Sequence, residues 1–81
     1  MIVTYDTTAK AMYFQLRPDV KVARTVRKDS VLLDLDDKGE LIGVEIIRPT
    51  NMKLRVIARK YHQPELSRVN SEKLQEALAA Q

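Results

Sequence analysis

The chain has 81 residues, no cysteine and a formal net charge of +3, so it suffices for one small domain and cannot form disulfides or thiolate metal sites. Its start lacks the basic and apolar regions of a signal peptide, and no apolar run approaches the roughly 20 residues of a membrane span. We therefore expect a cytoplasmic domain that contacts no membrane. A chain this short buries only about 60 % of its unfolded surface, which favours oligomerisation.

The N-terminal half predicts three β-strands. Ile2–Tyr5 is rich in β-branched and aromatic residues, and residues 6–8 are turn-forming. Side chains over Ala11–Leu16 alternate between two faces, as in a strand with one core face, until Pro18 stops the pattern. Lys21–Arg27 predicts a third strand, and its half-polar alternation favours a position at the edge of a sheet.

The strongest local pattern is a hairpin over Val31–Ile47, in which two apolar arms flank an acidic turn that contains Gly39. Every second residue of each arm is aliphatic. The two aliphatic sets share one face only if the loop has an even number of residues. This register predicts Leu33 opposite Ile42, with Gly39 supplying the positive φ of the turn.

The second face of this hairpin is partly apolar as well. It carries four residues that we take as candidate interaction residues: Leu32, Leu41, Gly43 and Ile47. A solvated face of an antiparallel sheet carries fewer aliphatic side chains. We therefore expect the C-terminal segment or a second copy of the chain to cover part of this face.

The C-terminal segment predicts helices. Apolar residues recur every three or four positions over Met52–Tyr61, which predicts an amphipathic helix capped by Thr50 or Asn51. A sixth strand is the alternative, because apolar residues there also alternate. Glu65–Val69 predicts a helical turn. A last helix is predicted from Glu72 to about residue 80, with the apolar stripe Leu74, Ala77 and Leu78.

These patterns together predict an α+β fold, namely an antiparallel five-stranded β-meander followed by two C-terminal α-helices. The sheet occupies residues 1–48 and the helical extension residues 51–81. We expect both to belong to a single domain over residues 1–81, because the sequence contains no repeat, linker or low-complexity segment.

The segment 48–60 carries five cations and no acid: Arg48, Lys53, Arg55, Arg59 and Lys60. The ordinary role of such charge is pairing with acids on solvated faces. The alternative is a basic surface for an acidic partner or for nucleic-acid phosphates. Two helices around a proline invite comparison with a helix-turn-helix, but Glu72 and Glu76 make the last helix a poor reader of a DNA groove.

No cluster of residues predicts catalysis, a metal site or a cofactor. Asp34, Asp36, Gly39 and Glu45 match positions of a calcium-binding loop, but Lys38 occupies a position that requires an oxygen ligand. Asp34 and Glu45 are expected on one face of the hairpin, with no pocket between them. The chain has one histidine, so a histidine metal cluster within one chain is impossible. We therefore expect a protein that is not an enzyme.

Several stretches resemble a known family: Tyr5-Asp6, Ala11–Leu16, Val31–Asp36 and Leu41–Ile46. Their most specific part is an Asp-x-Asp-x-x-Gly-x-x-x-Gly-x-Glu run, here at Asp34, Asp36, Gly39, Gly43 and Glu45. Over about residues 3–47 the chain resembles the family of small prokaryotic proteins called domain of unknown function 2283 (DUF2283). It departs from that family at Lys10, where members commonly carry an acid.

The resemblance implies an antiparallel sheet and a cytoplasmic bacterial protein, and it implies no activity. It also suggests an antitoxin-like role beside a small toxin, and it marks Gly43 as a family feature. Opposite Leu32, Gly43 would leave room for a large side chain such as Tyr13 to lie across the sheet.

We expect the chain to be a small non-enzymatic protein-interaction module, without cofactor, that works as a homodimer or as the partner of a small protein. Binding of nucleic acid through the basic segment 48–60 is the alternative.

Overall fold

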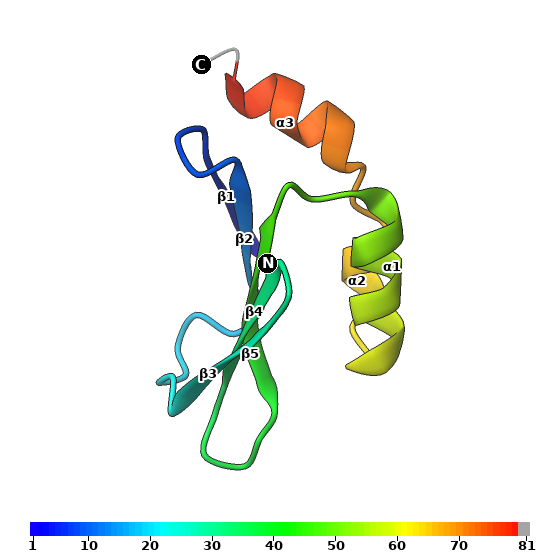
Figure 1. Ribbon diagram of the computed structural model, residues 1–81. Coiled ribbons are helices and arrows are strands. Elements are labelled where there is room, and N and C mark those ends of the chain that lie inside the picture. The colour runs from blue at the N-terminus through cyan, green and yellow to red at the C-terminus, as the bar shows by residue number, and fades with distance from the viewer. Residues whose placement is uncertain (80–81) are drawn as a thin grey trace. The chain divides into compact units, whose positions relative to one another are not determined.

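The computed structural model describes residues 1–79, without the side chains of Ala77 and Leu78. The described part contains a five-stranded antiparallel sheet followed by helices, which confirms the predicted α+β class. The strands are β1 (Ile2–Asp6), β2 (Ala11–Gln15), β3 (Arg24–Lys28), β4 (Val31–Leu35) and β5 (Leu41–Ile47), and the helices are α1 (Asn51–Lys60), α2 (Pro64–Ser67) and α3 (Ser71–Ala79) (Figure 1).

The chain divides into two compact units, the sheet unit Met1–Arg48 and the helical unit Pro49–Gln81. That all 81 residues form a single domain stays a prediction. Charge is divided unequally between the units. The sheet unit has eight Lys and Arg and eight Asp and Glu residues, whereas the helical unit has six and three, so the helical unit carries the whole net charge of +3.

The order of the strands corrects the predicted meander. Across the sheet the order is β1-β2-β5-β4-β3, so β2 pairs with β5 and not with β3. Strands β3, β4 and β5 follow one another as hairpins, and the long connection after β2 makes the four strands a Greek key. A meander would place the half-polar β3 in the centre. The Greek key instead puts β3 at the edge, as its sequence predicts, and the apolar β5 in the centre.

The third strand is also shorter than predicted. It begins at Arg24 rather than Lys21, because the two-residue turn after Lys28 aligns it with the five residues of β4. The Ala23 N–H still donates to the Leu35 carbonyl at 2.8 Å. Val22 precedes the strand and is 41 % exposed.

The register of the central hairpin differs from the prediction by two residues. Leu33 lies opposite Val44 rather than Ile42, and Asp34 lies opposite Gly43. The loop is odd, not even: the Gly39 N–H donates to the Asp36 carbonyl, and the Asp36 N–H donates to the carbonyl of the residue after Gly39. Gly39 has φ +80°, as in a three-residue hairpin loop that ends in a left-handed residue.

A β-bulge reconciles this odd loop with a single apolar face. The register shifts between Asp34 and Leu35, which leaves Ile42 as the extra residue of β5. The Ile42 carbonyl accepts hydrogen bonds from the N–H groups of Leu16 and Arg17, at 2.8 and 3.1 Å. The bulge keeps Leu33 opposite Val44 while it places Leu35 opposite Leu41, so the predicted sharing of one face by the two arms holds despite the wrong loop length. Leu41 was predicted on the second face of the hairpin, and this is wrong, because the extra residue turns it to the face of Leu35.

The core face of the sheet is formed by alternate residues of the inner strands. Five side chains there are at most 3 % exposed: Met12, Phe14, Leu33, Val44 and Ile46. Their alternation follows from the two-residue period of a strand, which directs successive side chains to opposite faces.

The helical unit begins at a capped helix. The Thr50 side chain accepts the Lys53 N–H at 3.1 Å, which confirms Thr50 as the cap and excludes the alternative sixth strand. Asn70 caps α3 in the same way, through the Lys73 N–H. The predicted apolar positions Ala77 and Leu78 and the predicted helix end at residue 80 lie outside the described residues.

One side chain joins the two longer helices. The Asn51 Oδ1 atom accepts both the backbone N–H and the hydroxyl of Ser71, at 3.0 and 3.2 Å. Ser71 is only 1 % exposed. Because buried polar groups need partners, this contact fixes the start of α3 beside the start of α1.

Candidate functional site

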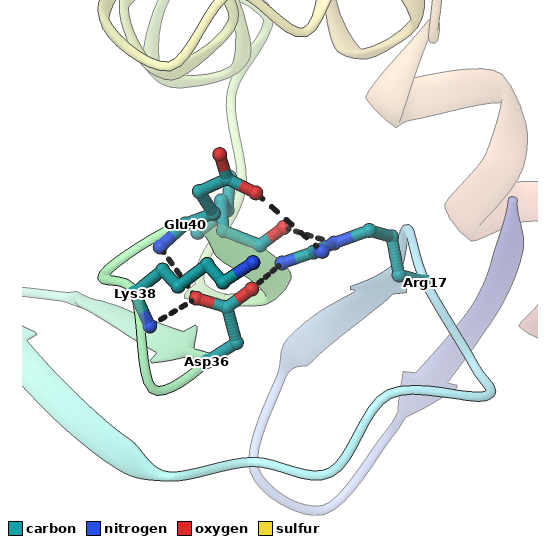
Figure 2. Close-up of polar contacts among 5 residues, drawn as sticks. Arg17, Asp36, Lys38 and Glu40 are labelled. Carbon is teal, nitrogen blue, oxygen red and sulfur yellow. Dashed lines mark hydrogen bonds and ion pairs between the residues drawn. The ribbon is translucent and has the colours of Figure 1, made fainter.

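The first polar cluster lies at the loop between β4 and β5. Arg17 follows β2 and directs its guanidinium toward Asp36 and Glu40 (Figure 2). Its Nη2 atom donates to Asp36 Oδ2 at 2.8 Å, Nε donates to the Leu41 carbonyl at 3.1 Å, and Nη1 lies 3.7 Å from Glu40 Oε2. Arg17 therefore clamps the start and end of the loop.

The Asp36 side chain also accepts hydrogen bonds from backbone N–H groups of its own loop. Its Oδ1 atom accepts the N–H groups of Lys38 and Glu40 at 2.9 and 2.8 Å. The bond from Arg17, and then the bond from the Glu40 N–H, lower the pKa of the Asp36 carboxyl. Both oxygens of the residue that matched a calcium-loop ligand position thus have protein donors.

The second polar cluster lies on the face of the sheet that is opposite to the core face. A Cβ atom on Gly43 would lie 2.7 Å from Tyr13 Cζ and 3.2 Å from Cε2. The Tyr13 ring therefore lies directly over Gly43, as the sequence suggested, although Gly43 pairs with Asp34 and not with Leu32. From β2 the ring spans β5, and its hydroxyl donates to Asp34 Oδ2 on β4 at 2.7 Å.

Asp34 accepts a second hydroxyl, that of Thr25 on β3, at 2.6 Å. The side chains of Tyr13, Asp34 and Thr25 thus form one polar ladder across four strands. Burial, and next the bond to Asp34, raise the pKa of Tyr13 to about 12; Glu45 adds to this as a nearby negative charge. The tyrosine is therefore a neutral donor at physiological pH.

The four candidate interaction residues have different environments. Leu41 is buried and Gly43 lies under the Tyr13 ring, so neither presents an open surface. Leu32 and Ile47 are half-buried. Sequence reasoning missed the two residues that complete the polar clusters, Arg17 and Thr25. The signal for Thr25 was absent, because its contact with Asp34 depends on the strand pairing.

The basic segment lies mostly on α1. The buried stripe of this helix is formed by Leu54, Ile57 and Ala58. On the opposite side Met52 is 71 % and Val56 is 61 % exposed. These two apolar side chains are one helical turn apart, and the cations flank them: Arg55 and Arg59 along one side, Lys53 and Lys60 along the other.

We call the face around Met52 and Val56 the α1 face. Arg48 is the last residue of the sheet unit, and its N–H donates to the Lys10 carbonyl at 2.7 Å. The Nζ atom of Lys60 lies 5.6 Å from the centre of the Tyr61 ring. The predicted basic patch therefore contains four helical residues and one residue of the sheet unit.

Two open grooves adjoin the α1 face within the helical unit. The first, of about 560 Å³, is lined by Arg55, Ala58, Arg59, His62, Pro64 and Ser67. The second, of about 270 Å³, is lined by Asn51, Arg55, Ser67, Arg68, Val69 and Asn70. Arg55 borders both grooves, so cationic side chains converge at this point of the unit.

The described residues contain no group of three or more His, Cys, Asp or Glu side chains placed to hold a metal ion. Across residues 1–79, none of the helices has the length and apolar character needed to cross a membrane.

Comparison with known protein families identifies a match for the sheet unit. The model of a family described as "Protein of unknown function (DUF2283)" matches residues 2–48, which is nearly the whole sheet unit. No match was found among curated proteins or among solved structures.

Proposed function

This chain belongs to the DUF2283 family of proteins of unknown function, and we propose that it is a non-enzymatic protein-interaction module that binds an acidic protein partner through the α1 face. The main observation behind the proposal is that the apolar residues Met52 and Val56 are 71 % and 61 % exposed. Exposed apolar side chains in a patch with a charged rim are typical of contact surfaces. A cytoplasmic location, which the absence of cysteine supports, is part of the proposal.

The composition of the α1 face favours a protein over a nucleic acid. Phosphate backbones need cations and gain little from exposed aliphatic side chains, whereas a protein partner can bury Met52 and Val56 and place acids beside the cations around them. The net charge of +3 on the helical unit would then speed the encounter with an acidic partner.

The experiment compares two matched double variants of the tagged full chain in affinity recovery from source cells. Met52→Ala with Val56→Ala removes the apolar surface, and alanine preserves the helix. Arg55→Gln with Arg59→Gln removes two charges and leaves the apolar surface. Val22→Ala, at an exposed site of the sheet unit, is the control for loss of an aliphatic side chain.

We expect wild type and the Val22 control to recover one protein in stoichiometric amount. After its purification, titration with the Met52 and Val56 double variant should show at least about tenfold weaker binding, because two apolar side chains no longer become buried. Full binding by that variant, or no recovered protein, would refute the proposal.

Nucleic-acid binding is the second candidate, favoured by the convergence of Arg55, Arg59, His62 and Arg68 at the two grooves. It is tested with a single-stranded and a double-stranded oligonucleotide of mixed sequence over a range of salt. This candidate expects affinity to fall steeply with salt. It also expects the Arg55 and Arg59 variant to reduce the slope by about two, with the Met52 and Val56 variant unchanged. Absence of binding at low salt would refute it.

A further inference from the structure

The two edges of the sheet differ in their protection against further pairing. The edge strand β3 carries three cations among its five residues: Arg24, Arg27 and Lys28. Such charges keep other strands from adding to an edge. The opposite edge strand β1 contains no cation and one acid, at its end, and Ile2 is 51 % exposed. Only β1 is therefore an edge without charged protection along its length.

Two backbone hydrogen bonds between the ends of β2 and β5 identify which backbone groups of β1 point outward. Leu16 and Arg48 donate to Ile42 and Lys10, so even-numbered positions of β2 direct their backbone groups toward β5. Odd-numbered positions of β2 therefore face β1. Their partners there are Ile2, Thr4 and Asp6.

Because neighbouring residues of a strand direct their N–H and C=O groups to opposite sides, Val3 and Tyr5 direct theirs away from the sheet. We propose that this edge pairs antiparallel with β1 of a second copy, with Val3 opposite Tyr5 and Thr4 opposite Thr4 on the two-fold axis. All outward groups of both strands then have partners, and the two sheets continue as one.

Side chains suit this register. Val3 and Tyr5 lie opposite Phe14 and Met12 of β2, and thus share the core face, where both are half-exposed. In the dimer Val3 meets Tyr5 of the second copy, an aromatic and β-branched pair that stabilises strand pairing. A register centred on Val3 or on Tyr5 would pair fewer residues of β1.

Charge permits the contact. The sheet unit has equal numbers of acidic and basic residues, so the net charges of the two sheet units do not oppose their pairing. The acid of β1 is also occupied: Asp6 Oδ1 accepts the N–H groups of Thr8 and Ala9 at 2.9 and 3.1 Å. Dimerisation uses the sheet unit and the α1 face lies on the helical unit, so this inference goes beyond the proposed function and each can fail without the other.

The absence of native cysteine permits a direct test on the full chain. In an antiparallel pair without mutual hydrogen bonds, as at Thr4 on the two-fold axis, Cα atoms are about 4.5 Å apart, a separation that a disulfide can bridge. We expect Thr4→Cys to form a covalent dimer on mild oxidation. Thr8→Cys, in the neighbouring exposed turn, should stay monomeric. Equal cross-linking of the two variants would overturn the proposal.

A charge exchange tests the same contact without oxidation. Sedimentation should show a wild-type dimer, monomers for Thr4→Lys and for Thr4→Glu alone, and a dimer again when the two variants are mixed, which also shows that both fold. Thr8→Lys should remain a dimer. A wild-type monomer at submillimolar concentration, or failure of the mixture to associate, would refute the proposed register.

Discussion

Replacement of Gly43 by alanine should destabilise the sheet unit, because the new methyl group would overlap the ring of Tyr13. If the ring stays, overpacking costs about 1–3 kcal/mol. If the ring moves away, the hydrogen bond from its hydroxyl to Asp34 is lost, which costs about 1.5–3 kcal/mol for a charged acceptor. Against this loss, alanine in a strand is more stable than glycine by roughly 0.5–1 kcal/mol, because glycine loses more backbone freedom on folding. The expected net loss in free energy of unfolding is thus about 1–2 kcal/mol.

Urea unfolding followed by far-ultraviolet circular dichroism, at one protein concentration, measures this loss. The decisive comparison is the same substitution in a Tyr13→Ala background. There the methyl group enters empty space, and Gly43→Ala should be neutral or stabilising by roughly 0.5–1 kcal/mol. The expected coupling between the two positions is therefore about 2 kcal/mol.

The control is Gly39→Ala, which introduces strain at φ +80° and touches no part of Tyr13. Its cost should be the same with and without the tyrosine. If Gly43→Ala behaves like this control and costs the same in both backgrounds, the ring does not occupy the space above Gly43, and the account of that face is wrong.

Three further outcomes follow from the hydrogen bonds. Because the pKa of Asp36 is lowered, its carboxylate stabilises the fold above the ordinary pKa, and this stabilisation is lost as pH falls through the lowered value. The urea midpoint of Asp36→Asn should therefore fall less on acidification than the urea midpoint of the wild type. Tyr13 should lose its stabilising effect as pH rises from 10.0 to about 12, and the stability of Tyr13→Phe should lack this dependence on pH. Ultraviolet titration of the wild type should show that the Tyr13 hydroxyl ionises near the raised pKa. Thr50→Ala should destabilise α1 by about 1 kcal/mol in thermal unfolding, because the Lys53 N–H loses its acceptor.

Local patterns predicted the elements of this fold better than their pairing. The alternation over β2, β4 and β5, and the spacing over α1, depend on neighbouring residues and could be identified in the sequence. The Greek-key order depends on which strands bury their faces together, which neighbouring residues do not determine. The register failed for a related reason, since the bulge at Ile42 inserts a residue that no alternation pattern can show.

The candidate sites were predictable to a different degree. The exposure of Val56 follows from helical spacing once Leu54 and Ile57 are taken as the buried stripe, but the strand alternative kept that position ambiguous. The contact of Tyr13 with Gly43 could be anticipated from the absent side chain. The clamp formed by Arg17 could not, because the residue lies just before the proline that ends the strand pattern and meets the loop only through the pairing of β2 with β5.

The structure gives physical roles to most of the motif by which the chain resembles its family. Asp34 accepts two hydroxyls across the sheet, Asp36 holds the loop and meets Arg17, Gly39 takes the left-handed turn position, and Gly43 gives way to the Tyr13 ring. The bond from Tyr13 to Asp34 ties β2 to β4 across the intervening β5, in addition to the backbone pairing of β5 with both strands. Since the motif is occupied in holding the sheet together, specific binding in this chain is best sought on the surfaces that it leaves open, the edge of β1 and the α1 face.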